Sequence, residues 1–586
     1  MQELHFDIVV VGASLGGVAA ALRASALGAK VCLLEASSWI GGQYSSQGVT
    51  RGDERAWMDG GIGCTASYRA FRGAAVEYYT KQFDLSSDGK TLSPFNPGAV
   101  DKNHASNLRI APRVAHETML SMLARAATPI TVTTGMPVVS AETAGTRVVA
   151  VVARPFYGAP VRYVASYFLD ATDLGELLAL ANVPFRLGAD SKADFGEPDA
   201  PGQRHQNWIQ PITVPIAIER RPEGENHTIP EPPGYKEISQ APKFKMEFAA
   251  GGGVFGVVRD ADSLFNYRQF IAHRNFADPL LPYDVTTLND VSNDYRWRSI
   301  PTGNSDQDAA IVVAARARSV AYAYWLQTEC DRDDGKGKGY PNLRIATEVF
   351  GTFDGTAPLP YIRESRRMIA KTTVRQQDVV VGGRPRANLF SDSVGIGHYG
   401  LDMHTIFGMD QYPAGDKVNV KHPSPFQIPL GALISPTVVN LIPACKNLGV
   451  THITNSAYRV HPIEWNVGES AGALAAFSLK RGVSPANVLS QKPLLRDFQH
   501  ALLDAGIPLY WWTDVGFGDS AGLFKPTQLA AVNGYLTRPE KLAFGPTDDL
   551  EPEERAAAEK LAGSALPWPS PKRGPAVRWL VDHLKL

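Results

Sequence analysis

The sequence has few cysteines and no closely spaced pair of them. Only four cysteines occur in 586 residues, and they are scattered: Cys32, Cys64, Cys330 and Cys445. Redox dithiols and structural zinc sites are usually built from CxxC pairs, so their absence argues against both kinds of site. We therefore expect no metal in this protein.

An excess of charge of one sign is also missing. Lysine and arginine number 58 against 59 aspartates and glutamates, which gives a formal net charge of −1. Proteins that bind nucleic acid or anionic membranes usually carry a clear surplus of positive charge. We expect no nucleic-acid partner.

Long uninterrupted apolar runs are lacking too. The apolar stretch over residues 8–34 is broken by glycines, Arg23 and Lys30, so we expect no membrane span. The N-terminus enters a strand-like run within six residues and lacks the basic-apolar-small pattern of a secretory signal, which predicts a cytoplasmic protein. A hydrophobic content of 44% is that of an ordinary globular protein, and the length predicts two or more domains.

The first 35 residues carry the pattern of a dinucleotide-binding βαβ unit. Residues 7–11 form an apolar run, and the sequence GASLGG follows at 12–17. An amphipathic stretch covers 18–27, and a second apolar run at 30–34 ends in Glu35. A glycine hexapeptide alone is a weak signal, but here the strand, helix, second strand and terminal acid are all in their places.

Each residue type in this unit suits one part of a dinucleotide. Gly12 permits the tight turn, Gly17 lets the helix lie close to the strand, and Ser14 replaces the usual middle glycine with another small residue. The first turn of the helix offers unpaired N–H groups to a pyrophosphate, and the acid accepts hydrogen bonds from a ribose. These considerations predict a cofactor site that includes Gly12, Ser14, Leu15, Gly16, Gly17 and Glu35.

Two later regions have the same strand-then-helix character. Four β-like runs between residues 130 and 169 predict a three-stranded meander that leads into a final strand. That strand ends in small and acidic residues before a helix, which predicts a second approach to the cofactor at Asp173. From about Glu464, a helix rich in small residues follows a strand at 438–445. The small residues predict close packing against the sheet, and the helix start equally suits a site for negative charge.

The chain resembles the FAD-dependent oxidoreductases of the glutathione-reductase-like superfamily, in the branch distantly akin to fumarate reductase flavoproteins. The resemblance covers most of residues 5–480. The motifs that carry it are GASLGG with Glu35, GGQYSSQGV at 41–49, LDATDLGELLALA at 169–181, LPYIRESRRM at 359–368, DSVGIGHYGLDMH at 392–404, PFQIPLGALI at 425–434 and THITNSAYRVHPIEWNVGESAGALAA at 451–476.

The resemblance implies FAD as the cofactor. It implies that the GGQ segment lies near the phosphates and the flavin, and that the block at 451–476 lies beside the isoalloxazine. The residues implicated in this way are Gly42, Gln43, Ser46, Arg459, Pro462, Asn466 and Val467. The family has no shared residue that fixes the substrate.

We predict an α/β fold with a Rossmann-like FAD-binding domain, which contains a parallel sheet and a β-meander. This domain is expected in two parts, 1–185 and 385–490. An inserted α+β substrate or cap region is expected at 186–384, and a helical appendix at 491–586.

A flavin dehydrogenase also needs a group that takes a proton from the substrate, and histidine does so near neutral pH. His461 is the first candidate because it precedes the helix expected beside the ring, and His398 and His404 come next. Arg366 belongs to a basic cluster that suits an anionic oxygen, although a salt-bridged helix face explains the cluster as well.

We predict an enzyme that oxidises a small polar molecule, such as an alcohol, a sugar-like compound or an amine, by hydride transfer to FAD. The electron acceptor is left open between oxygen, a quinone and a partner protein. A flavin-dependent monooxygenase or reductase that uses an external reductant is one alternative. A flavin-binding protein without catalytic activity is another.

Overall fold

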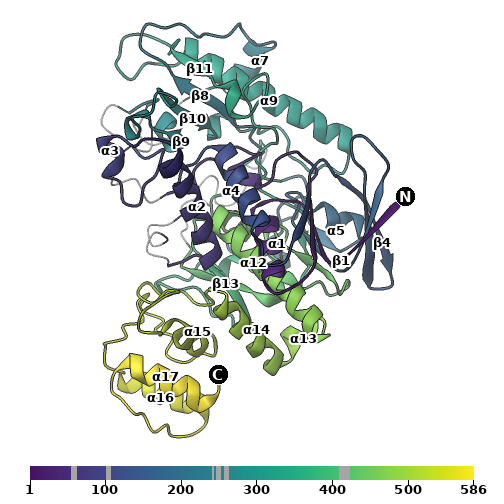
Figure 1. Cartoon of the computed structure of the whole chain (residues 1–586), viewed down its shortest axis with the longest axis vertical. Coiled ribbons are helices and arrows are strands. Elements are labelled where there is room, and N and C mark those ends of the chain that lie inside the picture. The colour runs from purple at the N-terminus through teal and green to yellow at the C-terminus, as the bar shows by residue number, and fades with distance from the viewer. Residues whose placement is uncertain are drawn as a thin grey trace.

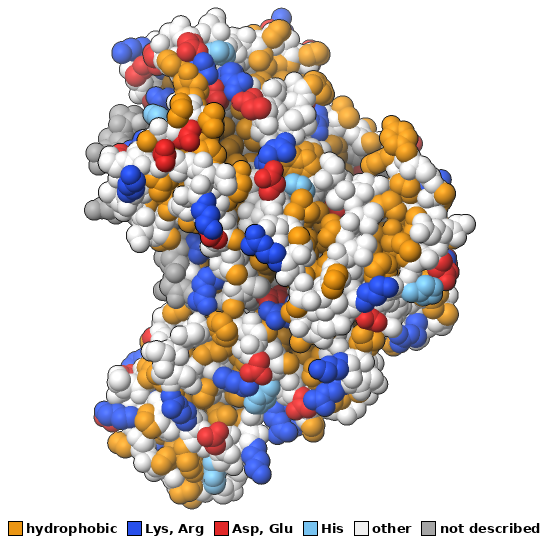
Figure 2. Space-filling model, viewed as in Figure 1, with side chains coloured by type: hydrophobic (Ala, Val, Ile, Leu, Met, Phe, Trp, Pro, Cys, Tyr) orange, Lys and Arg blue, Asp and Glu red, His pale blue; other side chains and the backbone are white. Residues whose placement is uncertain are grey.

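The computed structural model describes residues 1–54, 58, 62–100, 107–240, 243–245, 253–256, 263–407 and 423–586. Figure 1 shows the sheet that contains β8, β10 and β11 and the long helix α9 at one end of the molecule, and helices α15, α16 and α17 at the other. Helices α1 and α12 lie between these ends, beside the largest sheet. Charged side chains of both signs are interspersed over the face drawn in Figure 2, in keeping with a net charge near zero.

The predicted βαβ unit is present at the N-terminus. Strand β1 (Gln2–Val11), helix α1 (Leu15–Ala26) and strand β2 (Val31–Leu34) follow one another, and β1 pairs with β2 in parallel, with Ile8 opposite Val31. All four residues of β2 are buried, as expected for a strand covered on both faces. The glycine segment at 12–17 therefore lies at the carboxyl end of a parallel strand, where α/β proteins bind their ligands.

The largest sheet has seven strands, in the order β3-β2-β1-β6-β5-β4, with β15 also paired to β6. The two halves of β6 have different partners: residues 161–164 pair with β5, and residues 168–170 pair with β15. The remaining strands of this sheet are β3 (Ile130–Thr133), β4 (Val138–Ala144), β5 (Arg147–Ala153), β6 (Val161–Asp170) and β15 (Leu441–Pro443).

The α/β class and the parallel sheet are confirmed, and one detail of the meander was wrong. The meander consists of the antiparallel strands β4, β5 and β6, whereas the run at 130–134 is the parallel strand β3 beside β2. Helix α4 (Pro112–Ala124) precedes β3 and forms the crossover connection to it, so β3 runs parallel to β2.

A second sheet is antiparallel and lies in the region expected to form the cap. Its order is β11-β8-β10-β9, and α9 (Ser305–Thr328) packs on β8 and β11. Asn304 caps α9 by accepting hydrogen bonds from two N–H groups of its first turn. The strands are β8 (Ile216–Arg220), β9 (Gln269–Ile271), β10 (Asp284–Leu288) and β11 (Leu343–Ile345). The domain boundaries stay a prediction.

The C-terminal residues contain four helices and pack on the rest of the protein, with one buried arginine among the contacts. Arg386 donates hydrogen bonds to the carbonyls of Lys541 and Leu542 at 2.9 and 3.0 Å, and its guanidinium lies 4.6 and 4.3 Å from the rings of Tyr510 and Trp512. The helices are α14 (Lys492–Asp504), α15 (Phe524–Val532), α16 (Pro552–Ala562) and α17 (Arg573–Leu584).

The other helices and strands join these parts. The remaining helices are α2 (Ala66–Gln82), α3 (Ser87–Lys90), α5 (Glu176–Leu180), α6 (Lys192–Phe195), α7 (Tyr235–Gln240), α8 (Leu264–Tyr267), α10 (Gln376–Val379), α11 (His452–Tyr458), α12 (His461–Arg481) and α13 (Pro485–Ser490). Two further strand pairs are β7 (Phe185–Arg186) with β12 (Arg367–Met368), and β13 (Ser393–Gly397) with β14 (Phe426–Pro429). None of the helices in the described ranges combines the length and the apolar character that a membrane span needs.

Helices α1 and α12 touch backbone to backbone. A β-carbon on Gly468 would lie 2.0 Å from the carbonyl oxygen of Gly16, and one on Gly472 would lie 2.2 Å from that of Ala20. A β-carbon on Gly16 would lie 1.9 Å from the carbonyl oxygen of Ala444. Such distances exclude any side chain, which explains why the helix from residue 464 is rich in small residues.

The first prediction concerns this contact. Gly468→Ala forces the two helices apart because the neighbour is backbone that cannot rotate away, and we expect a loss of about 3 kcal/mol or more in the free energy of unfolding. Gly73→Ala is the matched control, since Gly73 also lies in a helix but a β-carbon there meets nothing within 4 Å. The control should gain about 0.5–1 kcal/mol. Urea denaturation measures both, and equal stability of the two variants would contradict the packing.

Candidate functional site

The glycine segment has the geometry of an anion site at the start of α1. Gly12 has a φ of +92°, a conformation that favours glycine. Ser14 is the N-cap of α1, and its hydroxyl accepts a hydrogen bond from the N–H of Gly17 at 3.3 Å. The Glu35 carboxylate accepts a hydrogen bond from the N–H of Ala13 at 2.7 Å, so the acid after β2 is held against the glycine segment. Burial raises the pKa of Glu35.

A cavity of about 570 Å³ opens beside this segment, and we call it the dinucleotide cavity. It brings together four of the predicted cofactor residues: Gly12, Ser14, Glu35 and Asp173. Apolar side chains from the meander side and from α9 line much of the remainder, among them Met136, Val138, Val312 and Val313, together with the polar residues Gln47, Thr172, Glu176 and Arg316. Its size and its apolar walls with a few polar groups are typical of cofactor sites.

The other predicted residues of the first glycine segment serve packing. Leu15 is fully buried in the core. A β-carbon on Gly17 would lie 2.1 Å from the carbonyl oxygen of Gly12, and Gly16 contacts Ala444 as described above. None of these three is among the residues that line the dinucleotide cavity, and their role as cofactor contacts stays a prediction.

The GGQ segment packs against the glycine segment. Gly42 has a φ of +49°, and a β-carbon there would lie 3.1 Å from Cα of Ser14. The amide of Gln43 donates hydrogen bonds to the carbonyl of Arg459, at 2.8 Å, and to the carboxylate of Glu464. Ser46 is buried, and its hydroxyl lies 3.5 Å from the carbonyl of Gly42.

The residues present fit a dinucleotide cofactor. Gln43 Oε1 is buried and accepts no hydrogen bond from any described residue, which leaves a free acceptor beside the glycine segment. An unsatisfied buried acceptor is costly unless a ligand group donates to it. The left-handed turn at Gly12, the carboxylate of Glu35 and the cavity volume agree with the same ligand.

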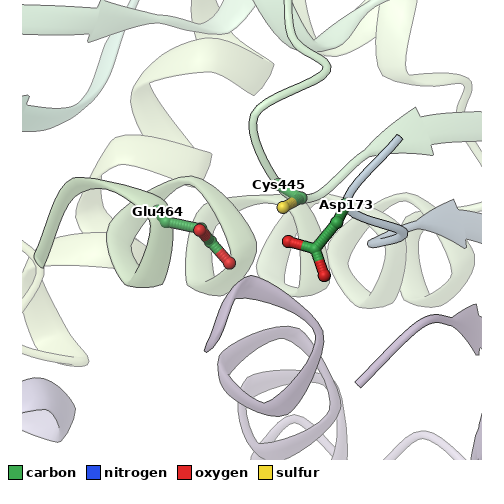
Figure 3. A group of neighbouring side chains, drawn as sticks. All are labelled: Asp173, Cys445 and Glu464. Carbon is green, nitrogen blue, oxygen red and sulfur yellow. The ribbon is translucent and has the colours of Figure 1, made fainter. Parts of the chain in front are cut away.

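A lysine and three potential ligand groups meet at the edge of this site. The side chains of Asp173, Cys445 and Glu464 converge from the ends of β6 and β15 and from α12 (Figure 3). Lys446 forms an ion pair with Asp173, and its Nζ lies 3.4 Å from Glu464 Oε2 and 3.8 Å from Cys445 Sγ. The lysine already supplies the positive charge that the two carboxylates need, so the cluster gives no reason to invoke a metal.

The ionisation of this cluster follows from its burial. Burial lowers the pKa of Lys446, but Asp173 and the other neighbouring groups outweigh it and raise this pKa well above the ordinary value. Burial raises the pKa of the Cys445 thiol well above its usual range, so the sulfur stays protonated. Glu464 also accepts a hydrogen bond from the N–H of Gly16 at 3.3 Å, which ties α12 to the first turn of α1.

The residues predicted at the start of α12 lie in the protein interior. Pro462 occupies the first turn of the helix. Asn466 accepts a hydrogen bond from the N–H of Ile396 at 3.0 Å and donates one to the hydroxyl of Ser470 at 3.2 Å, so its amide is engaged with β13 and α12. Val467 is fully buried. Contact of these three residues with a cofactor stays a prediction.

A second cavity, of about 310 Å³, is lined mainly by polar and charged side chains, and we call it the polar cavity. Three arginines, three aspartates, three tyrosines and one histidine contribute to it. The described residues that line it are Asp53, Tyr267, Arg268, Asn289, Asp290, Val291, Tyr361, Arg363, Tyr399, Asp402, His404 and Arg459. The predicted residues His404 and Arg459 therefore share one cavity.

His404 lies between two carboxylates. Its Nδ1 is 2.5 Å from Asp294 Oδ2, and its Nε2 is 3.6 Å from Asp402 Oδ2. Each carboxylate also holds an arginine, Arg363 on Asp294 at 2.9 Å and Arg459 on Asp402 at 3.0 Å. Burial and Arg363 lower the pKa of His404, but the two carboxylates outweigh them, and this pKa lies above its ordinary value.

His461 is fully buried and does not line the polar cavity. Its Nδ1 accepts a hydrogen bond from the N–H of Asp53, and its Nε2 lies 3.3 Å from the carbonyl of Val49. Burial lowers the pKa of His461 to about 4, so the ring is neutral at neutral pH. It positions the 49–53 segment, which carries Asp53 into the cavity wall, and its role as the base stays a prediction.

The other two catalytic candidates also lie outside the lining of the polar cavity. The half-buried ring of His398 lies 5.5 Å from that of Trp511. Arg366 donates a hydrogen bond to the carbonyl of Leu174 at 2.9 Å, and its guanidinium lies 5.5 Å from the ring of Phe185. Their catalytic roles stay predictions.

Sequence reasoning missed most of the polar cavity. Asp53, Arg268 and Asp402 come from three distant segments, and no motif or spacing joins them. The position of Lys446 could have been predicted. It follows the strand β15, so it stands at the carboxyl edge of the parallel sheet, near the glycine segment.

A comparison with known proteins identifies the family of this chain. A family model described as "FAD dependent oxidoreductase" matches residues 7–502. No curated protein matches the chain.

Among solved structures, AlpK is similar at 16% identity over 39% of this chain and 40% of its own, with a TM-score of 0.22. The myxobacterial chondrochloren halogenase CndH shares 15% identity over 39% and 45%, with a TM-score of 0.24. The glycerol-3-phosphate dehydrogenase from Bacillus halodurans, complexed with FAD, shares 17% over 37% and 40%, with a TM-score of 0.21. The chain spans less than half the length of these proteins, and such low TM-scores say nothing about activity.

The second prediction concerns the neutral imidazole of His461. Its pKa in the fold is about 4, and that of an unfolded histidine is about 6.5. Between these values the unfolded chain binds more protons, so stability falls as the pH falls. We expect a loss of about 2 kcal/mol in the free energy of unfolding between pH 7 and pH 5 from this residue.

Urea denaturation of His461→Gln at both pH values tests this. The variant is expected to be less stable at pH 7, because two buried contacts change, but to lose less on acidification. The control His5→Gln replaces a histidine whose side chain is 66% exposed, and it should keep the wild-type pH dependence. An unchanged pH dependence in His461→Gln would contradict the assignment.

Proposed function

Because the chain belongs to the FAD-dependent oxidoreductase family, we propose that it is a dehydrogenase or oxidase acting on a small polar substrate in the polar cavity. The dinucleotide cavity would hold FAD, with Gly12, Ser14, Glu35 and Asp173 at its polar end. FAD supplies the hydride acceptor when it is bound. The residues of the polar cavity would bind and orient the molecule that is oxidised.

The observation that carries this proposal is that the two cavities share one wall. The segment 358–363 borders both: Pro360 and Ile362 line the dinucleotide cavity, whereas Tyr361 and Arg363 line the polar cavity. Over residues 360–363 the side chains alternate between the two cavities, so the cavities are neighbours along this segment. Hydride transfer by direct contact needs the flavin ring to reach past the segment into the polar cavity. The link from Gln43 to the carbonyl of Arg459 joins the GGQ segment to the polar cavity as well.

The polar cavity suits an uncharged molecule with hydroxyl groups. Among the described residues that line it, three arginines are balanced by three aspartates, so their net charge favours neither a cation nor an anion. A hydroxyl group both donates and accepts hydrogen bonds, so it can pair with a carboxylate and with an arginine or tyrosine at once. This supports an alcohol or sugar-like substrate over an amine.

His404 is proposed as the group that takes the substrate proton. It is the histidine among the residues that line the polar cavity, and its Nε2 makes only a long contact of 3.6 Å with Asp402. Asp294 fixes the ring from the other side through Nδ1. The neutral ring accepts a proton at Nε2, and the two carboxylates then stabilise the resulting cation.

The third prediction tests the cofactor site without a substrate. Glu35→Ala removes the carboxylate proposed to hold the adenosine ribose, and we expect FAD to bind about 10–100-fold more weakly. Titration of the apoprotein with FAD, followed by flavin fluorescence, measures the dissociation constant. Glu77→Ala, at an exposed position of α2, is the control. Wild-type affinity in Glu35→Ala would rule out this role.

The proposed reaction has a direct test. The FAD-loaded protein is mixed anaerobically with simple alcohols, sugars and amines, and the flavin absorbance is followed. Bleaching by a hydroxylated compound is expected. Bleaching only by NAD(P)H, or by none of these compounds, would refute the proposal.

The fourth prediction concerns the pH dependence of that bleaching. The base form of His404 exists only above its raised pKa, so the rate constant should rise with pH, with the midpoint of the rise above the ordinary histidine pKa of about 6.5. Asp402→Asn removes one of the carboxylates that raise this pKa and should move the rise to lower pH. Asp331→Asn, on an exposed loop, is the control. An identical profile in Asp402→Asn would exclude His404 as the base.

A further inference from the structure

Two chain segments run outward side by side from the pair formed by His404 and Asp294. The guanidinium of Arg296 donates to the carbonyl of Thr405 at 2.8 Å and to its hydroxyl at 3.1 Å. The N–H of Phe407 then donates to the carbonyl of Arg296 at 2.8 Å. The segments 294–297 and 404–407 are thus held together from the cavity to their outer ends.

The outer ends carry two exposed aromatic residues that touch one another. Trp297 is 40% exposed and Phe407 is 39% exposed, and their ring centres are 5.5 Å apart in an edge-to-face arrangement. Trp297 follows Asp294 by three residues, and Phe407 follows His404 by three residues. Three residues span at most about 10 Å along the chain. We call Trp297 and Phe407 the aromatic rim.

A third residue shows that the cavity opens on this side. Val291 lines the polar cavity and is also 36% exposed, so the cavity reaches the surface there. Arg318 connects this opening to the rim: it donates a hydrogen bond to the carbonyl of Ser292 at 2.7 Å, and its guanidinium lies 5.1 Å from the ring of Trp297. The aromatic rim therefore stands beside the mouth of the polar cavity.

The size of the cavity limits what lies inside it. About 310 Å³ is at the lower end of the range for small-molecule sites. One small polyhydroxylated ring fits in such a space and two complete rings exceed it, so a second ring has to extend towards the mouth. Sugar rings have polar edges but apolar C–H faces, and those faces stack on aromatic side chains. Exposed aromatic side chains at the mouth suit such a second ring.

We propose that the aromatic rim is an outer subsite for the second ring of a carbohydrate whose terminal ring is oxidised in the polar cavity. The inference rests on the proposed function, and it narrows the substrate class from small polar molecules to glycosides and short oligosaccharides. The inner residues fix the reacting ring through hydrogen bonds, whereas the rim adds affinity through stacking and acts mainly on KM.

The test compares matched sugars on the FAD-loaded protein. Glucose is paired with cellobiose and maltose, galactose with lactose, and xylose with xylobiose. Anaerobic flavin bleaching shows which sugars react, and kcat/KM is then measured from steady-state turnover with an artificial redox dye as the electron acceptor. For a pair that reacts, we expect the disaccharide to exceed the monosaccharide about tenfold, as one good ring contact is worth. In Trp297→Ala and Phe407→Ala this ratio should fall towards one, chiefly through a higher KM for the disaccharide.

Phe156→Ala is the control, because Phe156 is 75% exposed but belongs to the turn between β5 and β6. It should leave both rates unchanged. Equal kcat/KM for mono- and disaccharides, or a ratio unaffected by both rim variants, would overturn the outer subsite and leave the proposed function standing. Bleaching by simple alcohols or amines but by no sugar would overturn it as well. Bleaching by none of these compounds would remove the proposed function itself.

Discussion

The close approach of α1 and α12 is the constraint on which both cavities depend. Gly16, Gly468 and Gly472 leave no room for a side chain between the two helices and the end of β15, so the first turn of α1 and the first turns of α12 are fixed relative to each other. Glu464, at the start of α12, reinforces this by accepting a hydrogen bond from Gly16. Arg459, which lines the polar cavity, comes just before α12, and the glycine segment, which lines the dinucleotide cavity, comes just before α1. The contact between the two helices therefore fixes these two cavity walls relative to each other.

Charge in the two sites is organised by the same physical rule. Removing a charge from water is costly unless an opposite charge compensates for it nearby. Lys446 meets this condition between Asp173 and Glu464, and each arginine of the His404 cluster meets it through an aspartate. The two histidines differ for that reason: two carboxylates raise the pKa of His404, whereas burial dominates at His461 and lowers its pKa to about 4. Environments that separate the pKa values of like groups also separate their roles.

The sequence predicted the parts of the site that are contiguous in the chain. The turn at Gly12, the capping Ser14 and the acid at Glu35 follow from one βαβ unit, whose spacing is set by the lengths of a strand and a helix. The polar cavity could not be predicted from the sequence, because Asp53, Arg268 and Asp402 meet only through the tertiary fold.

One misjudgement, on the strand at 130–134, has a definite physical cause, whereas the role of His461 stays a prediction. The run at 130–134 has the composition of any short strand, and only the preceding crossover helix decides that it pairs in parallel with β2. His461 stands at the predicted helix start, as the pattern indicated. Periodicity does not tell which side of the helix start faces a cavity, however, and the side chain lies in the core, where it holds the segment that carries Asp53.

In the proposed function, the segment 358–363 lets a cofactor site of the kind common to the family lie beside a substrate site particular to this chain. Ile362 and its alternate neighbours belong to the dinucleotide cavity, whereas Tyr361 and Arg363 belong to the polar cavity. Other walls of the polar cavity come from residues 267–268, 289–291 and 402–404, which lie outside the βαβ unit. Changes in those residues alter the shape and charge of the polar cavity without touching Gly12, Ser14 or Glu35. In the proposed function, the fold would separate cofactor binding, which the helix contact fixes, from substrate recognition, which these other segments would control.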